Sequence, residues 1–165
     1  MKCLVHFPKS RLAELASEFG GVSRAEAITN AQAGLEIMRG EADHAIGEKL
    51  TALEAIAAAP HDPHGYSPAQ LAELLARGDQ IVTLASTFGH DALDTAARCL
   101  CDLAAGLGRA GIADVASVKV HVRTMRLLAP GATLAKDHQD RVLSELARIL
   151  DFHGFSRSAI TVAEP

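Results

Sequence analysis

A long stretch without proline, between Pro8 and Pro60, constrains the fold of this chain more than any other feature. Ser23 near its start is followed three residues later by Glu26, which forms a capping box of the kind that begins helices. Because proline breaks helices and none interrupts this stretch, we predict one long helix over residues 24–58. Apolar residues recur there every three or four positions, as in an amphipathic helix: Ile28, Ala31, Leu35, Met38, Ala42, Ile46, Leu50, Leu53 and Ala57.

Capping residues and turn glycines divide the rest of the chain into shorter helices. Ser67-Pro68-Ala69-Gln70 joins an N-cap serine, a proline at the first helical position and a capping box, so a second helix begins there. We expect it to reach about Phe88, with a defect at Gly78-Asp79. The other helices are predicted from the same signals at about 92–107, 114–129 and 134–153, with a short one at 10–19.

Composition agrees with an all-α fold. Alanine and leucine, which favour helices, supply nearly a third of the 165 residues, while aromatic residues are only 4% and tryptophan is absent. Short connections make successive helices antiparallel. We therefore predict an antiparallel helical bundle of four to five helices plus the short N-terminal helix. Residues 1–165 are expected to form a single domain with a loose C-terminal tail over 155–165.

Charge and cysteine usage restrict the partners and the compartment. The net charge of −4 gives no global basic field for nucleic acid. Cys3, Cys99 and Cys101 form no C-x-x-C pair, so a disulfide framework is not expected and a reducing compartment fits best. The apolar run near the N-terminus is too short for a signal peptide, and no stretch is long enough to span a membrane. We expect a soluble, cytoplasmic protein without a membrane partner.

Sequence patterns of enzymes and metal sites are absent. The chain lacks the nucleophile-elbow, zinc-protease and phosphate-loop motifs. His61-Asp62-Pro63-His64 contains metal-ligand residue types, but its two prolines make the loop too stiff to wrap around one ion. Cys99 and Cys101 are typical of small core residues on a helix. We therefore expect no enzyme activity, no metal site and no cofactor.

A basic stripe is the most distinctive local feature. Lys119, Arg123 and Arg126 follow one another at helical spacing and share one face. That face could bind an acidic surface or a phosphoryl group. The adjoining apolar face is formed by Val118, Val122 and Met125. His121 lies between two valines and is expected to be half-buried.

The segment 84–103 resembles part of the histidine phosphotransfer (Hpt) domain. That family has a helical hairpin with an H-x-x-K-G motif, a turn glycine and a following L-x-x-x-[AC]-x-x-L helix. Matching Gly89 to the turn glycine places Asp79 at the position of the phospho-accepting histidine. Val82 and Thr83 then stand at the lysine and glycine positions. The resemblance implies a helical bundle in a phosphorelay, without the nucleophile that the transfer reaction needs.

A second resemblance covers more of the chain. Gly20-Gly21 before a long helix, the segment 85–101 and the segment 118–128 are similar to CheE-type helical proteins encoded with alphaproteobacterial chemotaxis genes. This resemblance implies a pathway rather than a reaction.

These features lead to a hypothesis of a non-enzymatic signalling or adaptor protein of a chemotaxis or two-component phosphorelay. It would bind a response-regulator receiver domain or a histidine kinase. The binding residues would be Asp79 and His90 of the hairpin, or Lys119, Arg123 and Arg126. One alternative is a scaffold that homodimerises through the long first helix. Another is an active phosphotransfer protein with a displaced histidine, for which His90 is the first candidate.

Overall fold

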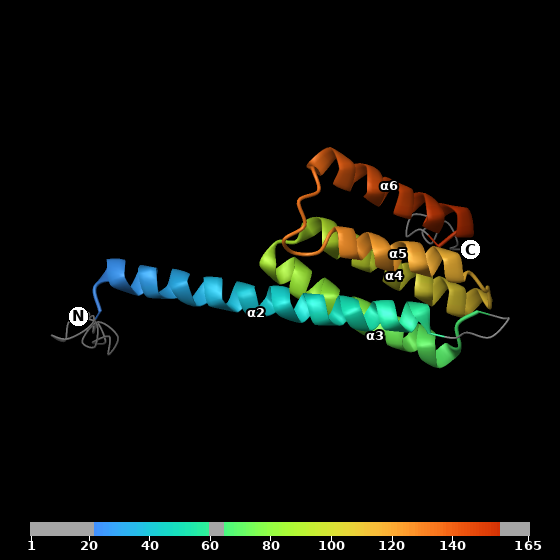
Figure 1. The fold of residues 1–165 in the computed structure, drawn as a ribbon, viewed down its shortest axis with the longest axis horizontal. Helices are drawn as coiled ribbons and strands as arrows, with labels where there is room; N and C mark the ends of the chain where they lie inside the picture. The colour runs from blue at the N-terminus through green and yellow to red at the C-terminus, as the bar shows by residue number, and fades with distance from the viewer. Residues whose placement is uncertain (1–21, 60–64, 156–165) are drawn as a thin grey trace, which may run out of the picture. The chain divides into compact units, whose positions relative to one another are not determined.

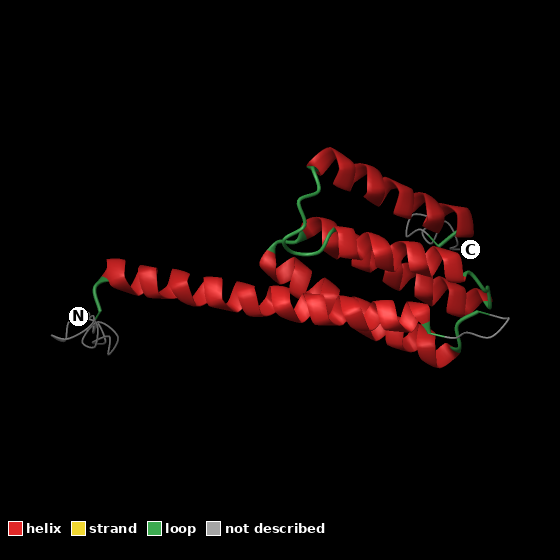
Figure 2. Cartoon of the chain, viewed as in Figure 1, coloured by secondary structure: helices red, strands yellow, loops and turns green. Residues whose placement is uncertain are grey.

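Five α-helices joined by short loops make up the residues that the computed structural model describes, 22–59 and 65–155 (Figure 1). Figure 2 shows the same part of the chain as helices and connecting loops. The predicted all-α, antiparallel helical bundle is confirmed. The helices are α2 (Arg24–Ala58), α3 (Pro68–Phe88), α4 (Asp91–Ala110), α5 (Val115–Leu127) and α6 (Lys136–His153).

The chain divides into two compact units, Met1–Met38 and Arg39–Pro165, and α2 belongs to both. Of the first unit, the structure describes residues 22–38, which include the first half of α2. The second unit contains the rest of α2 and all of α3 to α6. The short helix expected at 10–19, the loop 60–64 with its histidines and the tail 156–165 lie outside the described residues. That the whole chain forms a single domain stays a prediction.

Side-chain and glycine caps set the ends of α3. The Ser67 hydroxyl accepts a hydrogen bond from the Gln70 backbone N–H at 3.2 Å, and the Gln70 side chain accepts one from the Ser67 N–H at 2.8 Å. At the other end Gly89 has a φ of 79°, the left-handed conformation that glycine adopts without strain. The expected defect at Gly78-Asp79 is wrong, because α3 is continuous there and Gly78 is buried.

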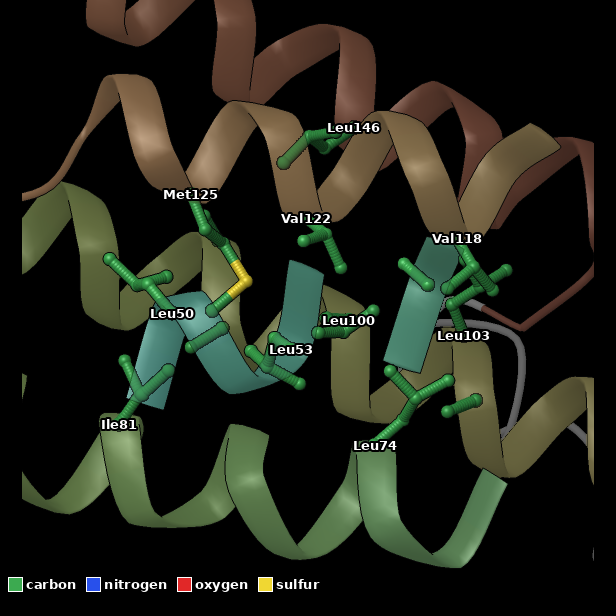
Figure 3. Packing of buried hydrophobic residues seen from close by; sticks show 14 of the residues in the cluster. Leu50, Leu53, Leu74, Ile81, Leu100, Leu103, Val118, Val122, Met125 and Leu146 are labelled. Atoms are coloured by element: carbon green, nitrogen blue, oxygen red, sulfur yellow. The ribbon is translucent and has the colours of Figure 1, made fainter. Parts of the chain in front are cut away.

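The core lies around α4, which packs against α3, α5 and α6. Its buried residues recur at helical spacing over the whole helix, which is why the chain can surround it with other helices. The second half of α2 adds its own apolar face to the same cluster (Figure 3). Labelled in that view are Leu50, Leu53, Leu74, Ile81, Leu100, Leu103, Val118, Val122, Met125 and Leu146.

The chain beyond α6 begins with an ordered contact. Phe155, expected at the start of a loose tail, is half-buried, packs against the core and stacks on the ring of His153 with centroids 5.4 Å apart. Among the described residues, no helix has the length and apolar character needed to cross a bilayer.

Candidate functional site

Helix α5 carries the predicted basic stripe, and its N-terminal cap fixes where the helix begins. The Asp114 carboxylate accepts hydrogen bonds from the backbone N–H of Ser117, at 2.9 Å, and from the Ser117 hydroxyl. His153 of α6 donates to the same carboxylate from Nε2 at 2.8 Å. Burial raises the pKa of Asp114, but these hydrogen bonds outweigh burial and hold the pKa below its usual value. The cap thereby joins the start of α5 to the end of α6.

The apolar side of α5 faces the core as predicted. Val118, Val122 and Met125 are buried, and they recur every three or four residues along one side of the helix. The three cations of the stripe follow the same spacing on the neighbouring side. Their backbone positions are therefore set by the packing of α5, and the differences between them arise from what each side chain contacts.

Arg126 is engaged within the protein. Its guanidinium binds the Glu54 carboxylate of α2 through two hydrogen bonds, Nε to Oε1 at 2.8 Å and Nη2 to Oε2 at 2.7 Å. Nη2 also donates to the Thr51 hydroxyl at 2.9 Å. The hydrogen bond from Arg126 lowers the pKa of Glu54, and Glu54 in turn raises the pKa of Arg126. This arginine therefore links α5 to α2, and its charge is already neutralised.

Lys119 and Arg123 have no such partner. Neither side chain makes an ion pair or a hydrogen bond to another residue in the described part of the chain, whereas Arg126 makes both. Both line a groove of about 370 Å³ between α2 and α5, whose other lining residues are Glu54, Ala57, Ala58 and Val122. The groove thus offers two cations beside an apolar floor, and the Glu54 carboxylate that also lines it is bound to Arg126.

Two apolar side chains beside these cations are exposed to solvent. Val120 and Leu127 are about half exposed, and with Arg123 between them they follow one face of α5. We call Lys119, Val120, Arg123 and Leu127 the α5 outer face. The α5 outer face thus combines exposed apolar area with two cations that have no ion-pair partner among the described residues.

The structure does not bring the predicted hairpin residues together. Asp79 is exposed on α3, and its carboxylate makes no ion pair to a described residue. His90, the N-cap of α4, donates from Nε2 to the Asp43 carboxylate of α2 at 2.7 Å. Asp79 lies nine residues before the end of α3, roughly 14 Å along that helix, whereas His90 follows the turn at Gly89. The hairpin residues therefore do not form one compact site.

The hairpin and the basic stripe also attach to different parts of α2. His90 is held at Asp43 and Arg126 at Glu54. Those two carboxylates lie eleven residues apart within α2, which is roughly 16 Å along the helix axis. The five predicted residues thus do not form one site. Asp79 is exposed on α3, and His90 is held at α2 separately from it. The basic stripe lies on α5, where Arg126 alone is bound to α2.

The burial of the polar residue His121 differs from the prediction made from the sequence. It is fully buried rather than half-buried as expected. Its Nδ1 lies 2.8 Å from the Ser117 carbonyl oxygen, which can only accept, so Nδ1 carries the proton and Nε2 presents a lone pair. That Nε2 has no hydrogen-bond partner among the described residues. Burial lowers the pKa of His121, which is therefore held neutral.

Metal-ligand residue types do not gather within the described ranges. No group of three or more His, Cys, Asp or Glu side chains there is placed to hold an ion. The sequence 61–64, whose residue types suggested a metal site, lies outside those ranges.

Comparison with known proteins identifies no relative. No family model matches the chain, and no curated protein or solved structure shows significant similarity to it.

Proposed function

We propose that this protein is a non-catalytic helical adaptor that binds an acidic segment of a signalling partner on the α5 outer face. One observation carries the proposal: Lys119 and Arg123 lack an acidic partner in the described chain, while Arg126 beside them has Glu54. Although the net charge of the chain is −4, these two cations have no ion-pair partner among the described residues, and the Glu54 carboxylate in their groove is bound to Arg126. An acidic partner segment would supply the missing charges.

The surrounding side chains support a protein ligand rather than a small anion. Val120 and Leu127 present apolar area on both sides of Arg123. Apolar contacts of this kind stabilise a complex, while the cations at the rim mainly steer association and select for acidic partners. A partner helix with acidic and apolar residues at helical spacing would match both features.

The expected partner is a response-regulator receiver domain or a histidine kinase. This expectation rests on the Hpt-like hairpin and on the CheE-type resemblance of the sequence. Asp79 at the acceptor position cannot act as a phospho-accepting imidazole, which supports binding without phosphotransfer. His90 is hydrogen-bonded to Asp43, which agrees with a structural role for that residue. A role in such a pathway places the protein in the cytoplasm.

Calorimetric titration of the full chain against purified receiver domains and kinases of its source organism tests the proposal. Each titration is run with and without beryllofluoride, which mimics the phosphorylated receiver. The double variant Lys119→Glu/Arg123→Glu should weaken binding about tenfold or more, because each substitution places like charges at the interface. The matched control is Lys136→Glu/Arg141→Glu on α6, which changes the net charge equally at two exposed cations.

The outcomes of this experiment distinguish the proposed adaptor function from its alternatives. Binding that is lost in the α5 variant and kept in the α6 variant supports the adaptor. Equal weakening in both variants would attribute the effect to net charge, and no binding to any receiver or kinase would overturn the expected partner. A stoichiometric phosphohistidine in the native protein would show that it is not a purely binding module.

A further inference from the structure

The first half of α2 exposes an apolar stripe that the second half of the same helix buries. Ile28, Leu35 and Met38 have 48%, 60% and 54% of their surface exposed. Farther along, Ile46 and Leu50 continue the same face and are completely buried. Within the described ranges, nothing covers this face of α2 between residues 28 and 38.

The spacing of this stripe differs between the two halves of the helix. From Ile28 through Ala31, Leu35 and Met38, the steps are three, four and three residues, which is the heptad spacing of paired helices. From Met38 the next two steps are both four, where the helix enters the core. A heptad seam keeps one face turned toward a partner helix, so the exposed half carries the pattern of a helix–helix interface.

We propose that this stripe packs antiparallel against the same stripe of a second copy of the chain. An antiparallel pair centred between Ala31 and Leu35 places each Leu35 opposite the small Ala31 of the second copy. It places each Ile28 opposite Met38. Large side chains then meet small ones at the centre, which lets two helices pack closely. The arrangement is two-fold symmetric, so it closes as a dimer.

Charges at the ends of the stripe favour this pairing. In this register Arg24 of one copy lies beside Glu41 of the other, and the symmetry produces this pair twice. Neither Arg24 nor Glu41 forms an ion pair with any residue in the described ranges of its own chain. A parallel pair would instead align Arg24 with Arg24 and Glu41 with Glu41. Opposite charges attract and like charges repel across such seams, so the antiparallel arrangement is the favoured one.

Residues beside the seam do not oppose association. Ala27, Gln32 and Gly34 flank its central part and are small or uncharged, while the charged Arg39 flanks its end. A second copy therefore meets no like charge along the central part of the stripe. An unrelated partner would need its own complementary seam, whereas a second copy already contains one.

Sedimentation equilibrium of the full chain over a range of concentrations tests the proposal. The weight-average mass should rise with concentration from 17.3 kDa toward twice that value. Leu35→Glu should raise the dimer dissociation constant at least tenfold, because the symmetry buries two carboxylates. Ile37→Glu is the matched control. Ile37 lies two residues after Leu35 on the same helix and is 65% exposed, but its side chain points away from the stripe. It should leave the dissociation constant unchanged.

Charge exchange tests the antiparallel register. Arg24→Glu and Glu41→Arg should each weaken the dimer severalfold, and the double variant should restore it. Circular dichroism confirms that each variant keeps its helix. A chain that stays monomeric at all concentrations would overturn the proposal. So would equal effects of Leu35→Glu and Ile37→Glu, while failure of the double variant to restore the dimer would overturn the register. The α5 substitutions do not touch this surface, so either proposal can fail alone.

Discussion

Gly78 of α3 lies against Cys101 of α4 so closely that a Cβ added to the glycine would be 2.7 Å from the cysteine Sγ. The Ala97 carbonyl oxygen is also within 3.8 Å of that added carbon. This contact explains why a residue that weakens helices occupies the middle of α3. The missing side chain lets α3 and α4 approach each other.

Substitution of Gly78 by Ala should therefore destabilise the protein. Alanine gains about 1 kcal/mol of helix propensity, but overpacking a close contact between helices costs about 1–3 kcal/mol. We expect a net loss in the free energy of unfolding by chemical denaturation. Combining it with Cys101→Ala should remove the steric conflict, so the double variant should be more stable than the sum of the single effects predicts. Additive effects would contradict the role assigned to this contact.

Gly40→Ala should have the opposite effect on stability. Gly40 lies in α2, and an added Cβ there meets nothing within 4 Å. The substitution should stabilise the helix by about 0.5–1 kcal/mol, because it removes conformational freedom from the unfolded chain. Thermal unfolding followed by circular dichroism measures the effect. A loss of stability equal to that of Gly78→Ala would show that close packing does not distinguish the two glycines.

Local signals predicted the helices well because they act within a few residues. Ser67 and Gln70 form the capping box that their spacing predicts, and Gly89 adopts the left-handed conformation expected of a turn glycine. Gly78 shows where such signals fail. Whether a glycine breaks a helix or allows close packing depends on the neighbouring helix, and that neighbour lies 23 positions away in the sequence at Cys101.

The three cations of the basic stripe should differ in their effect on stability. Arg126→Met removes a two-point ion pair with Glu54, and both side chains are partly exposed. Surface pairs of this kind contribute about 0.2–1 kcal/mol, so we expect a loss in that range. Lys119→Met and Arg123→Met should change the free energy of unfolding by less than about 0.5 kcal/mol. Denaturant titration of the three variants, with Glu54→Gln completing a double-mutant cycle, tests this difference.

The same comparison shows how far the site could be predicted. The shared face of Lys119, Arg123 and Arg126 follows from helical spacing alone. The partner of Arg126 could not be predicted, because Glu54 lies 72 residues away and only the packing of α5 on α2 brings them together. The complete burial of His121 could not be predicted for a similar reason. Its valine neighbours indicate some burial, but the helices packed around α5 determine that burial is complete.

The cap of α5 should contribute more than an ordinary surface residue. Asp114→Ala removes the acceptor of the Ser117 N–H and of the His153 ring. Loss of a helix N-cap costs about 0.5–2 kcal/mol, and the loss of the histidine contact adds to it. Asp114→Asn keeps an N-cap acceptor and should recover part of the stability. The free energy of unfolding near pH 7 measures both, and equal losses would assign the whole effect to the charge rather than to the cap.

The buried His121 should make the protein sensitive to mild acid. Burial lowers its pKa in the folded protein below the ordinary value of 6.5. The unfolded chain therefore binds a proton near pH 6.5 that the folded protein does not. Stability due to neutral His121 is fully present above that pH and is lost as the pH falls below it, by up to about 1.4 kcal/mol per pH unit for one proton. The lowered pKa values of Glu54 and Asp114 also make the stability depend on pH, but only at a lower pH, below the usual carboxyl range.

Denaturant unfolding between pH 7.5 and about pH 5 isolates the effect of His121. His121→Leu removes the titrating group and the unpaired Nε2, so its stability should depend less on pH than that of the unsubstituted protein. His138→Leu replaces an exposed histidine of α6 and should keep the original dependence. If the two variants change the slope equally, burial of His121 is not its cause. If His121→Leu also retains its stability at pH 7, the unpaired imidazole contributes little to the fold and mainly sets its acid limit.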